Sequence, residues 1–415
     1  MTLRFMTAGE SHGPALVAIL DGMVAGLPLQ AEQIDNELKR RQQGYGAGAR
    51  MQIEKDSVNI LGGVMDGRTT GAPLALLIEN ADAIRWRGKA IEPMTAPRPG
   101  HADLTGAVKY GYTDLRPALE RASARETAAR VAVGAICKLF LAQFDIRVGG
   151  YVVSIGEVDA ALADLPYAER LARAGQSDVR CPDPDAAGRM HQQIARAMQA
   201  RDTLGGLLEI VALNLPLGLG SFAQWDRRLD ARLAAAVMSV PAIKGVEIGS
   251  AFENARRTGT QVQDAIHLAV PTGYPAQAPS QEESAQAPAN AGTQSADLVR
   301  TTNHAGGTEG GISNGQPLVI RAAMKPIAST LLPQPTVDLA SGADSHTKYE
   351  RSDFCPVPRA VPILEAMIAF TLADALLEKL GGDSLAELLP RFASLRRANL
   401  EHLSMDNFAH VWWPE

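Results

Sequence analysis

The sequence has little cysteine and few aromatic residues. Only three of its 415 residues are cysteines, Cys137, Cys181 and Cys355. This odd, widely spaced set fits neither a disulfide framework nor a zinc-finger spacing. Aromatic residues make up 5% of the chain and apolar residues 46%, so we expect a large core built by close packing of Ala- and Gly-rich segments. These features predict a protein of a reducing compartment, the cytoplasm, without a metal site.

The chain also lacks an excess of positive charge and a long apolar run. Its net charge of -6 argues against nucleic acid as a partner, because domains that bind nucleic acid are usually basic. The N-terminus has no basic-then-apolar leader, and we expect no apolar run near the ~18 residues of a membrane span. The sequence therefore predicts a soluble protein that binds neither nucleic acid nor a membrane.

Three polar side chains, Glu10, Ser11 and His12, lie between glycines that separate two apolar segments, 3–7 and 14–20. Burying such side chains costs several kcal/mol unless each has a partner. Histidine is the side chain best placed to move a proton near neutral pH. A lone histidine is more often structural than catalytic, so both interpretations stay open for His12 on this stretch alone.

A second glycine-framed histidine, His101, lies in Arg98-Pro-Gly-His-Ala-Asp103. Two such histidines favour acid–base chemistry. Guanidinium groups bind phosphates and carboxylates through two parallel hydrogen bonds, and arginines recur beside these segments. They are Arg41, Arg50, Arg98, Arg121, Arg125 and Arg351. Any one of them could simply pair with a surface acid, but together they predict a site for a small polyanion.

Hydrophobic periodicity predicts a mixture of strands and helices. Strands are expected over 3–7, 14–20, 51–54, 58–61, 73–78, 151–155, 207–215 and 317–322. Helices are expected over 30–43, 117–144, 183–200, 226–239 and 362–380, with a weak one in the last thirty-odd residues. Residues 275–297 are rich in Ala, Gln, Pro, Ser and Glu, so we expect a disordered insert within one domain. The five glycines within 306–315 are a weak signal for a phosphate-binding loop.

Three motifs carry a resemblance to a known family: Gly9-Glu-Ser-His-Gly13, Arg121-Ala-Ser-Ala-Arg-Glu-Thr127 and Arg351-Ser-Asp353. Their order and length resemble the chorismate synthase family over roughly residues 3–380. The resemblance implies a lyase of the shikimate pathway, which removes phosphate from 5-enolpyruvylshikimate 3-phosphate by 1,4-anti elimination. The family needs reduced FMN although there is no net redox change, and NADPH is the implied ultimate reductant.

The resemblance also implies an architecture and an assembly. The fold would be α+β, a β-α-β sandwich with helices packed between antiparallel sheets. A catalytic domain would cover 1–381, interrupted by the insert at 275–297, and 382–415 would be a C-terminal extension. The implied assembly is a homotetramer in the cytoplasm.

Residue roles follow from the motif positions. The resemblance implies that His12 protonates the departing phosphate, that His101 acts beside the flavin, and that Asp353 tunes or deprotonates flavin N5. Substrate anions would be held by Arg41, Arg50, Arg98, Arg125 and Arg351. FMN would be held by Arg121, Ala122, Ser123, Ala242, Gly310, Lys325, Pro326, Ile327, Ala328, Ser329 and Arg351.

The sequence departs from the family pattern at three positions. Ala47 stands where many members have another anion-binding arginine, Pro241 replaces Asn or Gln, and Phe354 replaces a smaller residue or proline. Two other classes of protein stay open on the same residues. A flavin- or phosphate-binding protein without catalysis would use the arginines and glycines but not the paired histidines. A dehydrogenase would consume NAD(P)H in proportion to its product.

Overall fold

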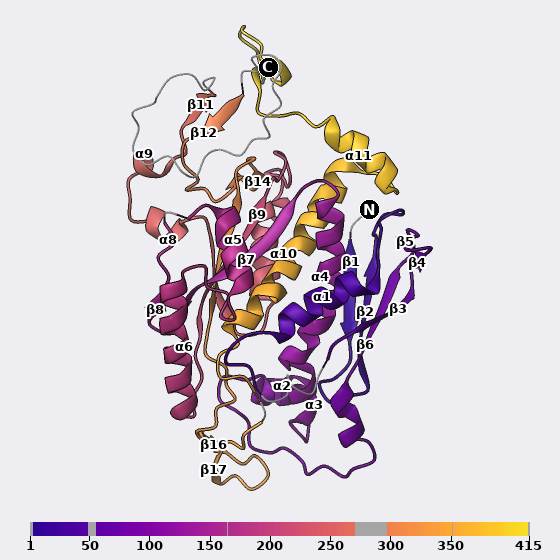
Figure 1. Cartoon of the computed structure of the whole chain (residues 1–415), viewed down its shortest axis with the longest axis vertical. Helices are drawn as coiled ribbons and strands as arrows, with labels where there is room; N and C mark the ends of the chain where they lie inside the picture. The colour runs from indigo at the N-terminus through magenta and orange to yellow at the C-terminus, as the bar shows by residue number, and fades with distance from the viewer. Residues whose placement is uncertain (1–2, 49–54, 164, 270–296, 351, 414–415) are drawn as a thin grey trace.

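The computed structural model describes residues 3–48, 55–163, 165–269, 297–350 and 352–413. Its helices and antiparallel sheets confirm the α+β class (Figure 1). The strand expected over 51–54 and nearly all of the insert expected at 275–297 lie outside the described residues.

The first sheet has four antiparallel strands in the order β1-β2-β6-β3. They are β1 (Arg4–Ala8), β2 (Ala15–Asp21), β3 (Val58–Gly62) and β6 (Leu74–Glu79). Alternation along β2 buries Leu16, Ala18 and Leu20 completely, whereas Ile19 between them is 45% exposed. One face of this sheet therefore lies on the core, as period-2 patterning predicts, and all four expected strands are confirmed to within two residues.

The second sheet has five antiparallel strands in the order β10-β15-β9-β7-β8. They are β7 (Arg147–Ile155), β8 (Val158–Asp159), β9 (Gly206–Leu213), β10 (Ile243–Ile248) and β15 (Leu318–Met324). Strands β7, β9 and β15 were predicted. The sequence did not predict strand β10, because Lys244 and Gly245 interrupt its apolar pattern. The strand is formed by its antiparallel pairing with β15.

The core is built around three helices: α1 (Ala31–Gln42), α4 (Thr127–Ala142) and α10 (Val357–Leu380). Helix α4 packs on β2 and β6, α10 packs on β7 and β9, and the two helices pack on each other (Figure 1). They approach most closely at Gly134, where an added Cβ would lie 2.2 Å from the Cβ of Ala366. A glycine is required there because no side chain fits between the two backbones.

The single helix expected over 117–144 is wrong at its start. Helix α3 (Arg116–Arg121) is followed by a 3₁₀ turn, Ala124–Glu126, before α4 begins. Ser123 breaks the helix because its backbone is extended and its side chain accepts a hydrogen bond from the Arg125 amide, which caps the turn. This break brings Ala122 and Ser123 to the cavity described below.

Helix α10 begins at Val357, five residues earlier than expected, and contains Pro362 in its interior. A mid-helix proline destabilises a helix because it removes one backbone hydrogen bond. Burial of nearly the whole of α10 compensates for this loss. By length and composition alone, α10 is apolar enough to cross a membrane. Its most apolar window, however, is 89% buried in the protein, as in a core helix.

The remaining elements surround these layers. The other helices are α2 (Asp103–Tyr110), α5 (Tyr167–Gln176), α6 (Pro184–Gln199), α7 (Leu229–Met238), α8 (Ala251–Asn254), α9 (Gly259–Val262) and α11 (Leu385–Ala393). Short hairpins pair β4 (Val64–Met65) with β5 (Arg68–Thr69), β11 (Ile266–Leu268) with β12 (Leu298–Arg300), β13 (Thr308–Glu309) with β14 (Ile312–Ser313), and β16 (Pro335–Val337) with β17 (Asp344–His346). The expected helices α1, α6 and α7 are confirmed, and α11 is the helix expected near the C-terminus.

Candidate active site

A cavity of about 480 Å³ gathers most of the residues singled out from the sequence. Its walls come from the loop after β1, the end of α1, the segment before α2, the turn between α3 and α4, the segment after β15 and the start of α10. This volume lies in the range of small-molecule sites. Segments far apart in the sequence therefore meet at one concave surface.

His12 is held at this cavity by Glu120 of α3. His12 Nδ1 lies 2.8 Å from Glu120 Oε1, and the His12 amide donates to Glu120 Oε2 at 2.8 Å. An ionised carboxylate only accepts hydrogen bonds, so Nδ1 carries a proton and Nε2 is left to exchange one with a ligand. Burial by itself would raise the pKa of Glu120, but hydrogen bonds and charge from His12 lower it overall. The indole ring of Trp86 lies against the imidazole, with 4.4 Å between ring centroids.

His101 is held by Asp103 in the first turn of α2. Its Nδ1 lies 2.6 Å from Asp103 Oδ1, and Asp103 is completely buried. The same carboxylate accepts from Arg98 Nε at 2.8 Å and Nη2 at 3.0 Å. Burial would raise the pKa of Asp103, but the hydrogen bonds from His101 and Arg98 hold it well below its usual range. Arg98 also donates to Ser329 Oγ at 2.9 Å, which joins this segment to the segment after β15.

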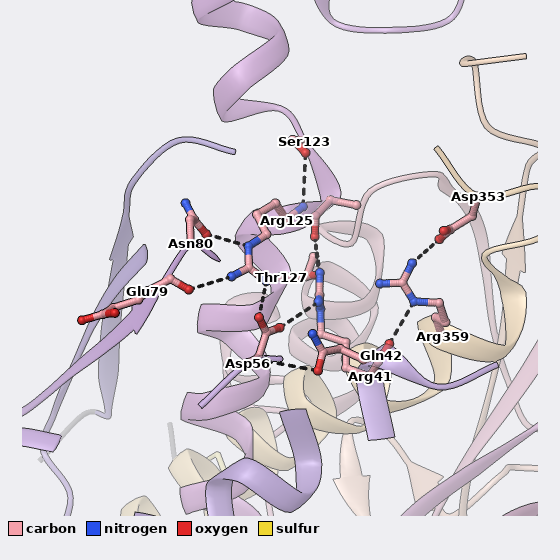
Figure 2. Close-up of polar contacts among 11 residues, drawn as sticks. Arg41, Gln42, Asp56, Glu79, Asn80, Ser123, Arg125, Thr127, Asp353 and Arg359 are labelled. Atoms are coloured by element: carbon pink, nitrogen blue, oxygen red, sulfur yellow. Dashed lines mark hydrogen bonds and ion pairs between the residues drawn. The ribbon is translucent and has the colours of Figure 1, made fainter. Parts of the chain in front are cut away.

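Two buried arginines share one carboxylate at the floor of the cavity (Figure 2). Arg125 Nη1 lies 2.6 Å from Asp56 Oδ1, and Arg41 Nη1 lies 3.4 Å from Asp56 Oδ2. Arg41 also donates to Thr127 Oγ1 and to the Ala124 carbonyl, so the turn between α3 and α4 fixes it. In the described part of the chain, these two guanidinium groups are bridged by the Asp56 carboxylate.

Asp353 is held by Arg359 of α10, which Figure 2 shows between Asp353 and the end of α1. Arg359 Nε donates to the Arg41 carbonyl at 3.0 Å, and the Gly48 amide donates to Asp353 Oδ1 at 2.7 Å. Both oxygens of Asp353 therefore have donors in the described part of the chain. Arg359 therefore links Asp353 to Arg41, the most buried of the lining arginines.

Basic side chains outnumber acidic ones among the described residues that line the cavity. The lining includes four arginines and one lysine, with two acidic residues, Glu350 and Asp353, while Asp56 and Asp103 pair with lining arginines from behind. Burial and the neighbouring cation Arg359 lower the pKa of Arg41 to about 9, and Asp56 opposes this only in part. A bound polyanion would stabilise all of these cations, which is the arrangement expected for a substrate with phosphate and carboxylate groups.

The cavity brings together thirteen of the residues predicted from the sequence. They are His12, His101, Asp353, Arg41, Arg98, Arg125, Ala122, Ser123, Ala242, Lys325, Ile327, Ala328 and Ser329. Arg50 and Arg351 lie outside the described residues. Arg121, Pro326 and Gly310 are described but are not among the lining residues. Arg121 instead donates to the carbonyls of Thr7 and Gly9 and so supports the loop that carries His12.

Sequence reasoning missed four residues of the site: Glu120, Trp86, Arg359 and Asp56. Glu120 immediately precedes the Arg121–Thr127 motif, and Arg359 follows the Arg351–Asp353 motif by six residues. Their place beside recognised motifs was a usable signal. No comparable signal marks Trp86 or Asp56, whose roles depend on contacts with distant segments.

A model of the family described as chorismate synthase matches residues 3–377. The chain belongs to the chorismate synthase family. It is 49% identical to the chorismate synthase of Trichlorobacter lovleyi over 398 residues, covering 93% of this chain and 96% of that protein. It is 49% identical to the chorismate synthase of Aquifex aeolicus over 407 residues, covering 94% and 96%. A crystal structure of chorismate synthase aligns with a TM-score of 0.74 at 43% identity, covering 95% of this chain and 97% of that one.

This family membership confirms the resemblance carried by the three motifs. The match spans the positions of Ala47, Pro241 and Phe354. Of the three, Pro241 lines the cavity, next to Ala242.

Proposed function

We propose that this chain is a lyase that converts 5-enolpyruvylshikimate 3-phosphate to chorismate and phosphate, the last common step of the shikimate pathway. The single observation that carries the proposal is the cavity itself. It places two carboxylate-held histidines, His12 and His101, among an excess of cationic side chains. A site that only binds an anion needs the cations but not the two histidine–carboxylate pairs.

In this reaction the substrate loses a proton from C6 and a phosphate from C3, and the C–H electron pair becomes part of the new diene. The phosphate leaves with the electrons of its C–O bond. We assign to His12 the donation of a proton from Nε2 to the leaving phosphate, since Glu120 holds Nδ1. Arg41, Arg98 and Arg359 would hold the anionic groups of the substrate and so orient it.

The residues at the cavity also fit reduced FMN, which has an apolar ring system and an anionic tail. Leu119, Met324 and Ile327 supply apolar wall, and Lys325 supplies a cation whose Nζ donates to the Gly100 carbonyl at 3.0 Å. A Cβ on Gly100 would lie 3.2 Å from Lys325 Nζ, so glycine keeps this wall open. When bound, reduced FMN would supply an electron-rich ring and a basic nitrogen next to the substrate.

We assign the residues at 121–123, Ala242, 325–329 and 351 to the binding of FMN, on the strength of the motifs and of the cavity that most of them line. Ala242 supports the assignment because it holds a left-handed backbone, with φ at 68°, and its carbonyl accepts from the Lys325 amide. Such a conformation is unfavourable for a non-glycine residue and is often kept at binding sites.

We further propose that the layers of Figure 1 form the β-α-β sandwich of a cytoplasmic homotetramer. Gly310 lies in the turn between β13 and β14, and Figure 1 shows β14 toward the end of the molecule opposite to α3. A contact between Gly310 and FMN would therefore come from a second copy of the chain. NADPH as the ultimate reductant stays a prediction.

The test is an anaerobic reaction of the protein with 5-enolpyruvylshikimate 3-phosphate, with FMN present before and after reduction by dithionite. We expect phosphate and chorismate in equal amounts only with reduced FMN, and at many turnovers per flavin. Consumption of NAD(P)H in proportion to product would indicate a dehydrogenase. Binding of FMN without phosphate release would indicate a binding protein and contradict the proposal.

A further inference from the structure

Arg116 lies one helical turn before Glu120 on α3 and has an unusual set of contacts. Its Nη1 is 4.0 Å from Glu120 Oε1, an ion-pair distance that is too long for a hydrogen bond. Its Nε and Nη1 are buried and have no hydrogen-bond partner in the described part of the chain. Arg116 does not line the cavity. It is therefore a cation with unused donors, placed behind the histidine–carboxylate pair rather than against a ligand.

Glu120 depends on His12 for its present partners. Both of its oxygens accept from His12, one from Nδ1 and one from the amide, each at 2.8 Å. The Glu120 side chain is only 12% exposed, and a carboxylate so buried is costly to keep ionised without a cation beside it. When His12 gives a proton to a leaving phosphate, the imidazole becomes neutral and Glu120 loses a counter-charge.

We propose that Arg116 is a positioning residue that supplies the counter-charge of Glu120 when His12 is neutral. This role rests on the proposed function, because it requires His12 to cycle between charged and neutral forms. The guanidinium has to move only from 4.0 Å to hydrogen-bond distance, and its Nη1 has a free donor for the contact. Trp86 lies beside both cations, 4.4 Å from the His12 ring and 6.0 Å from the Arg116 guanidinium carbon.

Loss of Arg116 has a specific chemical consequence for the pair. With one cation fewer, the proton between His12 and Glu120 can settle on the carboxylate. His12 is then a neutral imidazole that carries its proton on Nε2, and it is a much weaker acid than the imidazolium. The proton count is unchanged, but the pair no longer presents a charged donor to the phosphate.

The test compares Arg116→Gln, Arg116→Lys and the control Arg173→Gln. Arg173 also forms an i,i+4 ion pair with a glutamate, Glu169, but on an exposed part of α5. Phosphate release with reduced FMN gives kcat and KM. Imidazole ¹H–¹⁵N spectra of protein labelled at histidine report the His12 tautomer, with its signals assigned by their absence in His12→Gln.

We expect Arg116→Gln to lower kcat by about tenfold to a hundredfold, less than loss of a direct acid–base group, with little change in KM. Its His12 should lose the form protonated at Nδ1, and Arg116→Lys should recover most of kcat and of the spectrum. Arg173→Gln should match the wild type in both readouts. An unchanged His12 tautomer in Arg116→Gln, or a loss confined to KM, would overturn the proposal.

Failure of the proposed function gives a different result. In that case the wild type itself releases no phosphate with reduced FMN, whereas the imidazole spectra can still be compared among the same variants. Thermal melting of each variant separates loss of the charge contact from loss of folded protein. If Arg116→Gln melts below the assay temperature, Arg116→Lys decides: a wild-type tautomer there supports the need for a cation, and an altered tautomer overturns it.

Discussion

The two histidines of the cavity are held in similar ways but in different electrical surroundings. Both hydrogen bonds to the Glu120 side chain come from His12, with Arg116 4.0 Å away, and the other neighbour of His12 is the ring of Trp86. His101 shares Asp103 with Arg98, whose Nη2 lies 3.0 Å from Nδ1 and 3.3 Å from Nε2 of the imidazole. A positive charge on His12 would face a carboxylate and an indole face, both favourable. A positive charge on His101 would face a permanent cation.

This difference separates the roles of the two histidines. His12 suits the donor of a proton to phosphate, because Glu120 holds its Nδ1 and leaves Nε2 for a ligand. His101 is held in a fixed tautomer by Asp103, with the Arg98 guanidinium beside its ring. The carboxylates differ accordingly: Glu120 serves one histidine, whereas Asp103 also anchors Arg98 and through it Ser329.

The largest effect on turnover is expected when either histidine is removed. His12→Ala and His101→Ala should each lower turnover by about 10²–10⁴-fold, the usual range for an acid–base group. Steady-state phosphate release with reduced FMN measures the effect. Near-normal turnover in either variant would remove that histidine from the chemistry.

Replacing the carboxylate of each pair should lower the free energy of unfolding by different amounts. Asp103→Asn leaves the Arg98 guanidinium buried without its counter-charge, so we expect a loss of about 3–5 kcal/mol in the free energy of unfolding. Glu120→Gln should cost about 1–3 kcal/mol, since its hydrogen bonds go to one residue, His12, and its ion pair with Arg116 is long, at 4.0 Å. Denaturant unfolding of both variants makes the comparison, and equal losses would contradict it.

Acid should also distinguish the pairs. The pKa values of Asp103 and Glu120 are lowered in the folded state, Asp103 more strongly. The folded protein therefore binds fewer protons than the unfolded chain at these groups, so their stabilisation is present above about pH 4 and is lost as pH falls below it. Unfolding free energies measured between about pH 2 and 4 should show a shallower pH slope in Asp103→Asn than in Glu120→Gln. The reverse order would be inconsistent with the contacts.

The smallest effect is expected far from both pairs. Deletion of residues 276–296 should leave turnover and FMN binding unchanged. The flanking strands β11 and β12 pair directly, and the Ala269 amide donates to the Asp297 carbonyl at 2.7 Å, so a short turn can close the gap. FMN titration and phosphate release test this, and lost FMN binding would show that the segment has a function.

The sequence predicts the parts of the fold that have strong periodicity. Alternation identifies β2 and β6, and apolar spacing with basic residues at the end identifies α1. It does not reveal the break at Ser123, because the Ala-rich segment around it, 118–133, has neither glycine nor proline and has good helix propensity throughout. Nor does it indicate that α10 continues through Pro362, since the burial that compensates for the proline is a tertiary effect.

The same limit applies to the site. His12 and His101 could be predicted because their glycine frames are local features of the sequence. The partner of His101, Asp103, is also local, two residues away. Glu120 is 108 residues from His12, and the two meet only because α3 folds over the loop between β1 and β2. Electrostatic surroundings of this kind depend on the tertiary structure and cannot be deduced from spacing.

The central claim is that Glu120 acts only through His12, whereas Asp103 acts through both His101 and Arg98. A pair of double-mutant cycles on kcat for phosphate release tests it most directly, because residues that act as a unit are not additive. We predict that Glu120→Gln has no further effect in the His12→Ala background, and that Asp103→Asn still lowers kcat in the His101→Ala background. An additional loss from Glu120→Gln without His12, or none from Asp103→Asn without His101, would contradict the account.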